Sequence, residues 1–102
     1  MSNVRITVVK RLSNKELFGD NPPLTFTGAA LCDKFEEGQV FISENGQSPE
    51  GFCAWAFADI QRDITHLRLG GSYPWIKEEG AILSSCTDGA RPVIFMLESV
   101  KD

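Results

Sequence analysis

The residues best suited to chemistry lie in the six-residue segment CTDGAR at positions 86–91. It holds a thiol, a hydroxyl, a carboxylate and a guanidinium, which a tight turn could bring together. Asp88-Gly89 is itself a turn signal, because glycine accepts a positive φ and aspartate bonds its own backbone. Two apolar runs flank the segment, so a hairpin loop of about five residues explains this pair without any chemistry. The turn has no need of three other residues, which are Cys86, Thr87 and Arg91.

A second candidate group follows from helical spacing. Trp55, Asp59, Arg62 and His66 are spaced i, i+4, i+7 and i+11, which places them on one face of a helix. A tryptophan on a polar face needs cover or a partner. Either the Tyr73-Pro74-Trp75 loop folds back over it, or Trp55 belongs to a ligand or partner surface. The simpler interpretation is that the polar residues are ordinary neighbours on a helix surface.

The thiols form the third group, comprising Cys32, Cys53 and Cys86. Together they are the candidate ligands for a metal ion or a redox site, because thiolates bind soft metals. The only histidine, His66, falls on the helix face opposite Cys53 and cannot join it on one ion. A free cysteine also behaves as a small buried hydrophobe, which is the simpler interpretation.

A small enzyme is the third possibility, with Asp59, His66 or Asp88 as general acid or base. No serine or cysteine is placed to act as the nucleophile beside His66. A catalytic triad is therefore not supported.

These residues need elements to position them, and the sequence predicts one main helix and about four strands. Alternation predicts strands near residues 4–12, 39–43, 81–86 and 92–100. A capping box of Ser13 and Glu16 predicts a short helix that ends at Gly19. Residues 20–30 are predicted to form an irregular loop. In the last strand both faces are apolar, which predicts a central strand that is covered on both sides.

The main helix is predicted near residues 49–69. Ser48 is the expected cap and Pro49 the first helical residue, and Gly70-Gly71 supplies the stop. Its buried stripe is expected to contain Cys53, Ala56, Phe57, Ile60, Ile64 and Leu67. The predicted fold is α+β, a small and mostly antiparallel sheet with this helix packed on one face.

Composition narrows the function classes. The chain has 102 residues and is expected to form a single domain, 1–102, with a net charge of −4. Its cations are scattered, which argues against nucleic-acid binding. It has no apolar stretch long enough for a membrane span and no signal peptide at its start. With an odd number of cysteines, this predicts a cytoplasmic protein with reduced thiols, and no cofactor is predicted.

Three motifs resemble those of a small family of conserved, uncharacterised bacterial and archaeal proteins. They read CDKFEEGQVF, GFCAWAFADI and CTDGARPVIF, and the resemblance extends from Ile6 to Glu98. In that family proline often follows the first cysteine, where this chain has Asp33. The resemblance implies a freestanding prokaryotic domain and supplies no activity. The positions that this chain shares with the motifs are Cys32, Phe35, Gly38, Cys53, Trp55, Asp59, Cys86, Thr87, Asp88, Gly89 and Arg91.

The function that this pattern favours is a non-enzymatic binding or accessory module. Its ligand would be a small anionic molecule or a protein partner, and a homodimer is compatible with the composition. The candidate binding residues are Trp55, Asp59, Thr87, Asp88 and Arg91. The alternatives are the thiol site and the acid–base enzyme.

Overall fold

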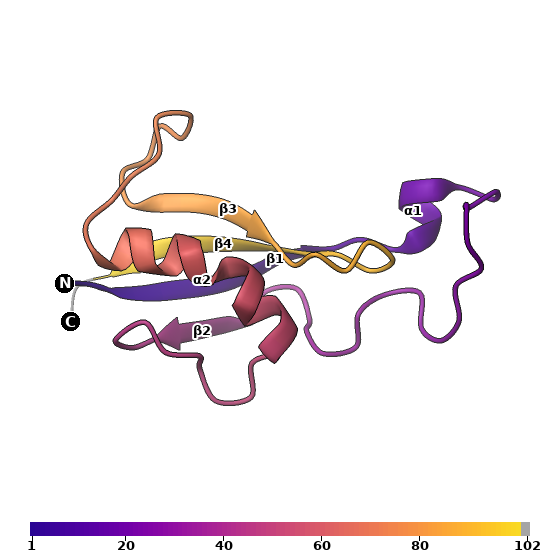
Figure 1. Cartoon of the computed structure of the whole chain (residues 1–102), viewed down its shortest axis with the longest axis horizontal. Coiled ribbons are helices and arrows are strands. Elements are labelled where there is room, and N and C mark those ends of the chain that lie inside the picture. The colour runs from indigo at the N-terminus through magenta and orange to yellow at the C-terminus, as the bar shows by residue number, and fades with distance from the viewer. Residues whose placement is uncertain (101–102) are drawn as a thin grey trace.

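The computed structural model describes residues 1–100, which form one four-stranded antiparallel sheet with a long helix across one face (Figure 1). The sheet order is β2-β1-β4-β3. The elements are β1 (Asn3–Arg11), α1 (Asn14–Phe18), β2 (Val40–Ser43), α2 (Ala54–Arg68), β3 (Ala81–Ser85) and β4 (Val93–Val100). The α+β prediction is confirmed, and β4 is central as expected, since it pairs with both β1 and β3.

The core lies between α2 and one face of the sheet. Alternate residues of the two central strands point into it, and they are Val4, Ile6, Val8, Val93, Phe95 and Leu97. The predicted stripe of α2 packs against them: Ala56, Ile60, Ile64 and Leu67 are buried, while Cys53 and Phe57 are partly buried. Burial of each large aliphatic side chain contributes about 1.5–3 kcal/mol.

The predicted start of the main helix is wrong by five residues. The helix begins at Ala54 with Cys53 as its N-cap, not at Pro49 after a Ser48 cap. The amide of Phe52 donates to the carbonyl of Pro49 at 3.2 Å, which closes a turn there. Gly51 has a positive φ of 77°, which breaks the helical path. This break in the helical path places the Phe52 side chain in the core, where it is buried.

Three aromatic rings connect the long loop to the core. The Phe35 ring lies 5.2 Å from that of Phe95 and 5.0 Å from that of Phe52. Only Phe95 comes from a regular element. Phe35 therefore holds the loop between α1 and β2 against the sheet. At the start of that segment, the predicted capping box is present, since Ser13 and Glu16 cap each other's backbone amides.

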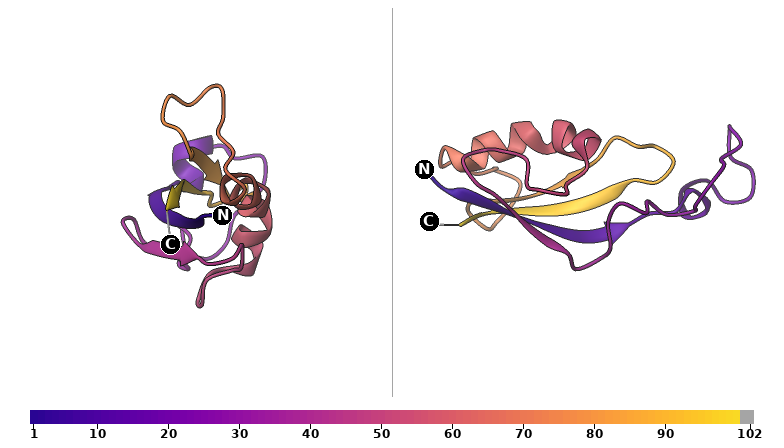
Figure 2. Two further views of the ribbon diagram at one scale, coloured as in Figure 1. Left: turned by 90° about the vertical axis from the view of Figure 1, so that its left-hand side faces the viewer. Right: turned by 90° about the horizontal axis from the view of Figure 1, so that it is seen from below.

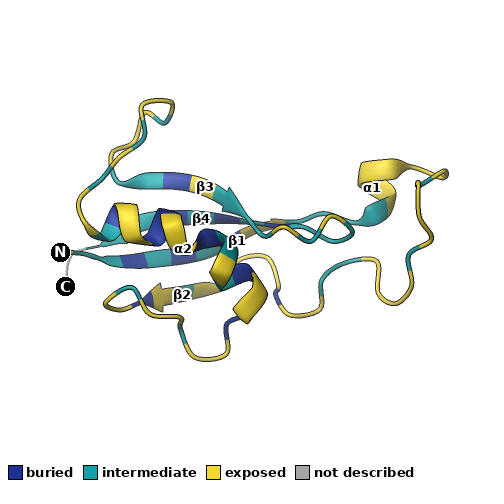
Figure 3. Cartoon of the chain, viewed as in Figure 1, coloured by how far each residue is buried: buried dark blue, intermediate teal, exposed yellow. Residues whose placement is uncertain are grey.

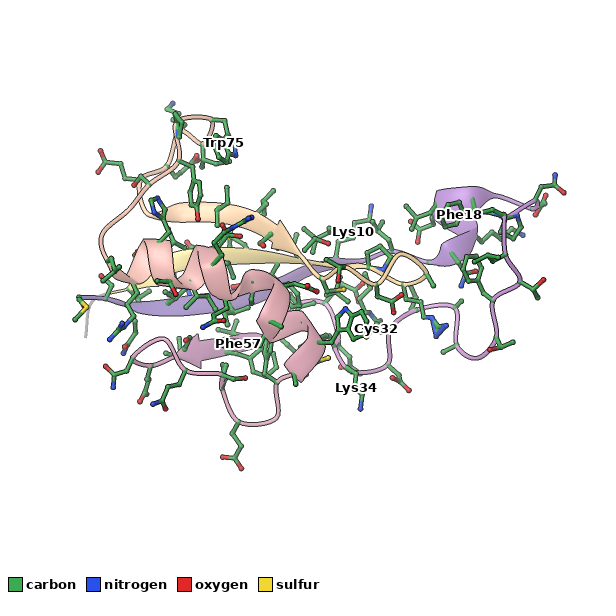
Figure 4. The ribbon with its side chains drawn as sticks, viewed as in Figure 1. Lys10, Phe18, Cys32, Lys34, Phe57 and Trp75 are labelled. Carbon is green, nitrogen blue, oxygen red and sulfur yellow. The ribbon has the colours of Figure 1, made fainter. Side chains whose placement is uncertain are left out.

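The helix α2 ends where its glycine pair predicts. Gly70 has a φ of 93°, and its amide donates to the carbonyl of Leu67 at 3.0 Å. The following loop, residues 71–80, extends beside β3, with Trp75 near its tip and far from Phe57 on the first turns of α2 (Figure 4). Of the two alternatives for Trp55, cover by this loop is therefore wrong: the loop leaves the opposite end of the helix, and Trp55 is exposed.

The second face of the sheet carries no helix. Seen from below, α2 lies along one side of the strands and the other side is open (Figure 2). Buried and partly buried residues alternate along β4 (Figure 3). Ile94 and Met96 lie between the core residues Val93, Phe95 and Leu97, so they point to the open side, where they are partly exposed. The expectation that both faces of this strand are covered is thus wrong within residues 1–100.

Gly71→Ala should lower the free energy of unfolding by about 1 kcal/mol, the typical worth of one hydrogen bond. A Cβ at Gly71 would clash with the His66 ring, so the ring must swing away from the carbonyl of Ser72, which it contacts at 2.9 Å. Urea unfolding measures the loss. Gly89→Ala is the matched control, because a Cβ there meets nothing within 4 Å. An equal loss from Gly71→Ala in a His66→Ala background would contradict the explanation.

Candidate functional site

Three of the predicted binding residues meet in one hydrogen-bonded network. The indole Nε1 of Trp55 donates to the hydroxyl of Thr87 at 3.0 Å. That hydroxyl donates to the carboxylate of Asp59, 3.0 Å from its nearer oxygen. The amide of Thr87 donates to the same carboxylate at 2.7 Å. Thr87 therefore holds both helix side chains in place. The turn itself does not require Thr87, and the structure shows that this residue bridges Trp55 and Asp59.

The elements explain why these residues meet. Trp55 and Asp59 are four residues apart on the first turns of α2, so their side chains leave the same face. Thr87 follows the end of β3, beside which α2 packs. The network leaves Trp55 64% exposed and Asp59 half-buried. The result is an aromatic side chain held in one position at the surface.

Asp88 and Arg91 make their contacts elsewhere. The Asp88 carboxylate accepts from the amide of Ala90 at 2.9 Å, which is the turn role that the Asp-Gly pair predicts. The guanidinium of Arg91 donates from Nη2 to the carbonyl of Thr27 at 3.1 Å. Its Nε is buried and has no hydrogen-bond partner within residues 1–100. Arg91 thus packs against the long loop instead of pointing at the Trp55 network.

The long loop is also held by Arg11. The Nε of Arg11 lies 3.0 Å from the Glu37 carboxylate, and its Nη1 donates to the carbonyl of Cys32 at 3.0 Å. Hydrogen bonds from the backbone amides of Glu37 and Arg11 hold the pKa of Glu37 below its usual value. The two arginines therefore hold the loop beside the hairpin formed by β3 and β4.

The three cysteines are free thiols, each partly buried against the core. Cys53 is the N-cap of α2 but makes no side-chain cap hydrogen bond. The Sγ of Cys86 accepts from the amide of Val93 at 3.3 Å. In the described part of the chain, no three His, Cys, Asp or Glu side chains are grouped so that they could hold a metal ion. The thiol hypothesis for Cys32 and the other two stays a prediction without support from the geometry.

A second polar cluster was missed by the sequence analysis. The Asp63 carboxylate is only 8% exposed, and it accepts from the hydroxyl of Tyr73 at 2.7 Å and from that of Ser84 at 2.8 Å. The hollow beside it, of about 350 Å³, is lined by Arg62, Asp63, His66, Ser72, Tyr73 and Pro74. The sequence holds one sign of this burial: Asp63 follows Ile60 by three residues and precedes Leu67 by four, which is the spacing of neighbours on one helix face. It therefore adjoins the buried stripe.

This cluster accounts for His66. Its Nε2 lies 2.9 Å from the carbonyl oxygen of Ser72, and its ring meets the ring of Tyr73 edge-on at 4.8 Å. Burial, and then the bond to Asp63, raise the pKa of Tyr73 well above its ordinary value. The cluster joins α2, β3 and the 71–80 loop, so its evident role is structural.

Comparisons of the chain with protein-family models, curated proteins and solved structures gave no match. The similarity to the bacterial and archaeal family therefore stays a prediction. Within residues 1–100, every helix is too short or too polar to span a bilayer.

Thr87→Val should free the indole of Trp55 and lower the free energy of unfolding by about 0.5–1.5 kcal/mol. In an NMR spectrum, the indole N–H signal of Trp55 should move, because its acceptor is lost. The Trp75 indole in the same spectrum is the internal control. Thr87→Ser keeps the hydroxyl and should leave the signal nearly in place. A Trp55 signal unchanged by Thr87→Val would refute the network.

Tyr73 is the only tyrosine of the chain, so its ionisation can be followed alone by ultraviolet absorbance. In the unfolded chain it should titrate near its ordinary pKa of about 10. In the folded protein the raised pKa delays tyrosinate formation. Stability from this group is complete below pH ~10 and is lost as the pH rises further, because the unfolded state then releases the proton first.

Tyr73→Phe should remove most of this loss of stability above pH ~10. Urea unfolding at a series of pH values makes the comparison. Tyrosinate appearing at the same pH in folded and denatured protein would rule out the buried hydroxyl–carboxylate pair.

Proposed function

We propose that the protein is a small cytosolic binding module whose α2 surface, centred on Trp55, takes a protein partner. The observation that carries the proposal is the fixed and exposed indole. Trp55 is 64% exposed, and its only polar atom is already bonded to Thr87. A rigid aromatic side chain loses little entropy on binding, and tryptophan is a frequent anchor of protein interfaces.

The charges beside Trp55 favour a basic partner segment. Within residues 1–100 neither Asp59 nor Asp88 forms an ion pair with a cation. The donors to Asp59 are the neutral amide and hydroxyl of Thr87, so the Asp59 carboxylate keeps its charge and adds negative potential beside the indole. A lysine or arginine side chain would gain from this potential and from the ring face.

The small anionic ligand has less support. Its predicted cation, Arg91, faces the carbonyl of Thr27 with its Nε buried, so this arginine does not point at the Trp55 network. The acid–base enzyme also has no specific contact in its favour, because His66 meets a backbone carbonyl and not a carboxylate.

Two short peptides of opposite charge, tetra-arginine and tetra-glutamate, test the proposal. Binding affinity is measured by isothermal titration calorimetry of the intact protein, and the indole NMR signals show where the peptide binds. Tetra-arginine should shift the Trp55 signal and tetra-glutamate should not. Trp55→Ala should weaken binding of the basic peptide at least tenfold, which corresponds to about 1.4 kcal/mol. Asp59→Asn, which keeps the acceptor oxygen for Thr87 but removes the charge, should weaken it less.

The matched control is Trp75→Ala, since Trp75 is equally exposed but belongs to the 71–80 loop. This variant should bind tetra-arginine as the parent does. The proposal fails if both tryptophan variants lose the same affinity, or if the two peptides bind alike.

A further inference from the structure

The face of the sheet opposite α2 exposes a row of apolar side chains. Strand alternation sends every second residue to this face, and the intervening residues point to the core. One cross-strand row spans all four strands, and its members in strand order are Val40, Thr7, Met96 and Leu83. Both outer members are more than half exposed, Val40 at 54% and Leu83 at 58%. Within residues 1–100 no helix packs over this row, and the 71–80 loop borders it at Leu83 and Met96.

A neighbouring row on the same face is centred on an ion pair. In strand order its members are Ile42, Arg5, Glu98 and Ala81. The Nε of Arg5 lies 3.2 Å from the carboxylate of Glu98. These two residues belong to the central strands β1 and β4, so the opposite charges flank the midline of the sheet.

A groove lies at one side of this face. It has a volume of about 360 Å³ and runs along β3 and the end of the 71–80 loop. Leu83, Met96 and Ala81 of the two rows line it, and Ile76 of the loop contributes a further apolar side chain. The face is therefore hollowed on the β3 side, and on the β2 side Ile42 and Val40 are exposed.

We infer that this face binds a second copy of the chain, related by a two-fold axis parallel to the strands between β1 and β4. Such an axis reverses the strand order of the facing sheet, so each row lies over its own reversed copy. Arg5 then faces Glu98 of the second copy, and Glu98 faces its Arg5. Four charges alternate in sign around the axis, which is the charge complementarity that a self-association of this face requires.

The same axis matches the apolar side chains. Val40 lies over Leu83 of the second copy, and Ile42 lies over its Ala81. Both exposed side chains of β2 are thus presented to the groove along β3, while Thr7 faces Met96. Two sheets packed face to face with nearly aligned strands are a common arrangement, and their layers are about 10 Å apart.

The area of the open sheet face can be compared with that of known protein interfaces. The strands β2, β1, β4 and β3 are 4, 9, 8 and 5 residues long. At ~3.3 Å per residue and about 4.8 Å between strands, they give a plan area of about 400 Å². Standard interfaces bury about 800 Å² on each partner. Area alone does not fix affinity, but a face of about half the standard size favours a weak dimer, with a micromolar or higher dissociation constant.

Sedimentation equilibrium of the intact protein over a wide concentration range tests the dimer directly. The apparent mass should rise from monomer to dimer. Met96→Arg should raise the dissociation constant at least tenfold, because it puts two cations into the apolar row. Gln61→Arg is the matched control, since it adds the same charge to an exposed position on α2. Circular dichroism checks that both variants are folded.

Charge reversal tests the two-fold arrangement itself and does not depend on Met96. Arg5→Glu alone sets glutamates against glutamates across the axis, and Glu98→Arg alone sets arginines against arginines. Each variant should be monomeric where the parent is dimeric. A mixture of the two should form heterodimers, because every facing pair then has opposite charges. The broken ion pair within each chain is not restored by mixing, so recovery of the dimer reports contacts between chains only.

Four outcomes would overturn the inference. The first three are a parent protein that stays monomeric up to about 1 mM, a dimer equally weakened by Gln61→Arg and Met96→Arg, and single charge variants that do not associate when mixed. In the first case the face would have to serve a different protein or none. A dimer that survives Met96→Arg unchanged would use another surface and would refute the proposal equally.

Discussion

The rest of the structure depends on the pairing of β1 with β4. These strands come from opposite ends of the described chain, and eight residue pairs align between them, from Asn3 opposite Val100 to Arg11 opposite Val93. The pairing makes one continuous apolar face, which α2 covers. It also sets where the chain must turn: the β3–β4 loop lies beside the start of α2, and Arg11 lies where it can hold the long loop. The site is a consequence of this register.

Much of the fold could be predicted because it follows from the pattern of apolar and polar residues within each segment. The alternation of apolar and polar residues predicts the strands. The helical spacing of apolar residues in α2 predicts the buried stripe from Ala56 to Leu67. The helix start signals near Pro49 are also local, but tertiary packing overrides them and the helix begins later, at Ala54. Phe52 packs against Phe35 and Phe95, and the chain must turn at Gly51 to bring it there. Burial of a large aromatic side chain outweighs a capping preference of about 1 kcal/mol.

The candidate site was predictable to the same extent. The spacing of Trp55 and Asp59 placed them together on a helix, whereas Thr87 joined them only through the docking of α2 on β3. The partner of Arg91 lies 64 residues away in an aperiodic loop, and no pattern in the sequence points to it. The buried role of Asp63 could not be predicted, because a carboxylate next to the buried stripe is stable there only if hydrogen-bond donors reach it. Its donors, Tyr73 and Ser84, are distant in the sequence and meet Asp63 only in the folded chain.

The two proposed surfaces lie on opposite sides of the sheet, and this separation has a physical consequence. A second copy seated on the open face would contact neither α2 nor Trp55, so both copies would keep their aromatic site exposed. The dimer would then present two equivalent sites on its outer layers. A partner with two basic segments could engage both, and the second contact would form at the high effective concentration that a linker provides. A module with weak single sites would in this way bind tightly to repetitive or dimeric partners and only weakly to single segments.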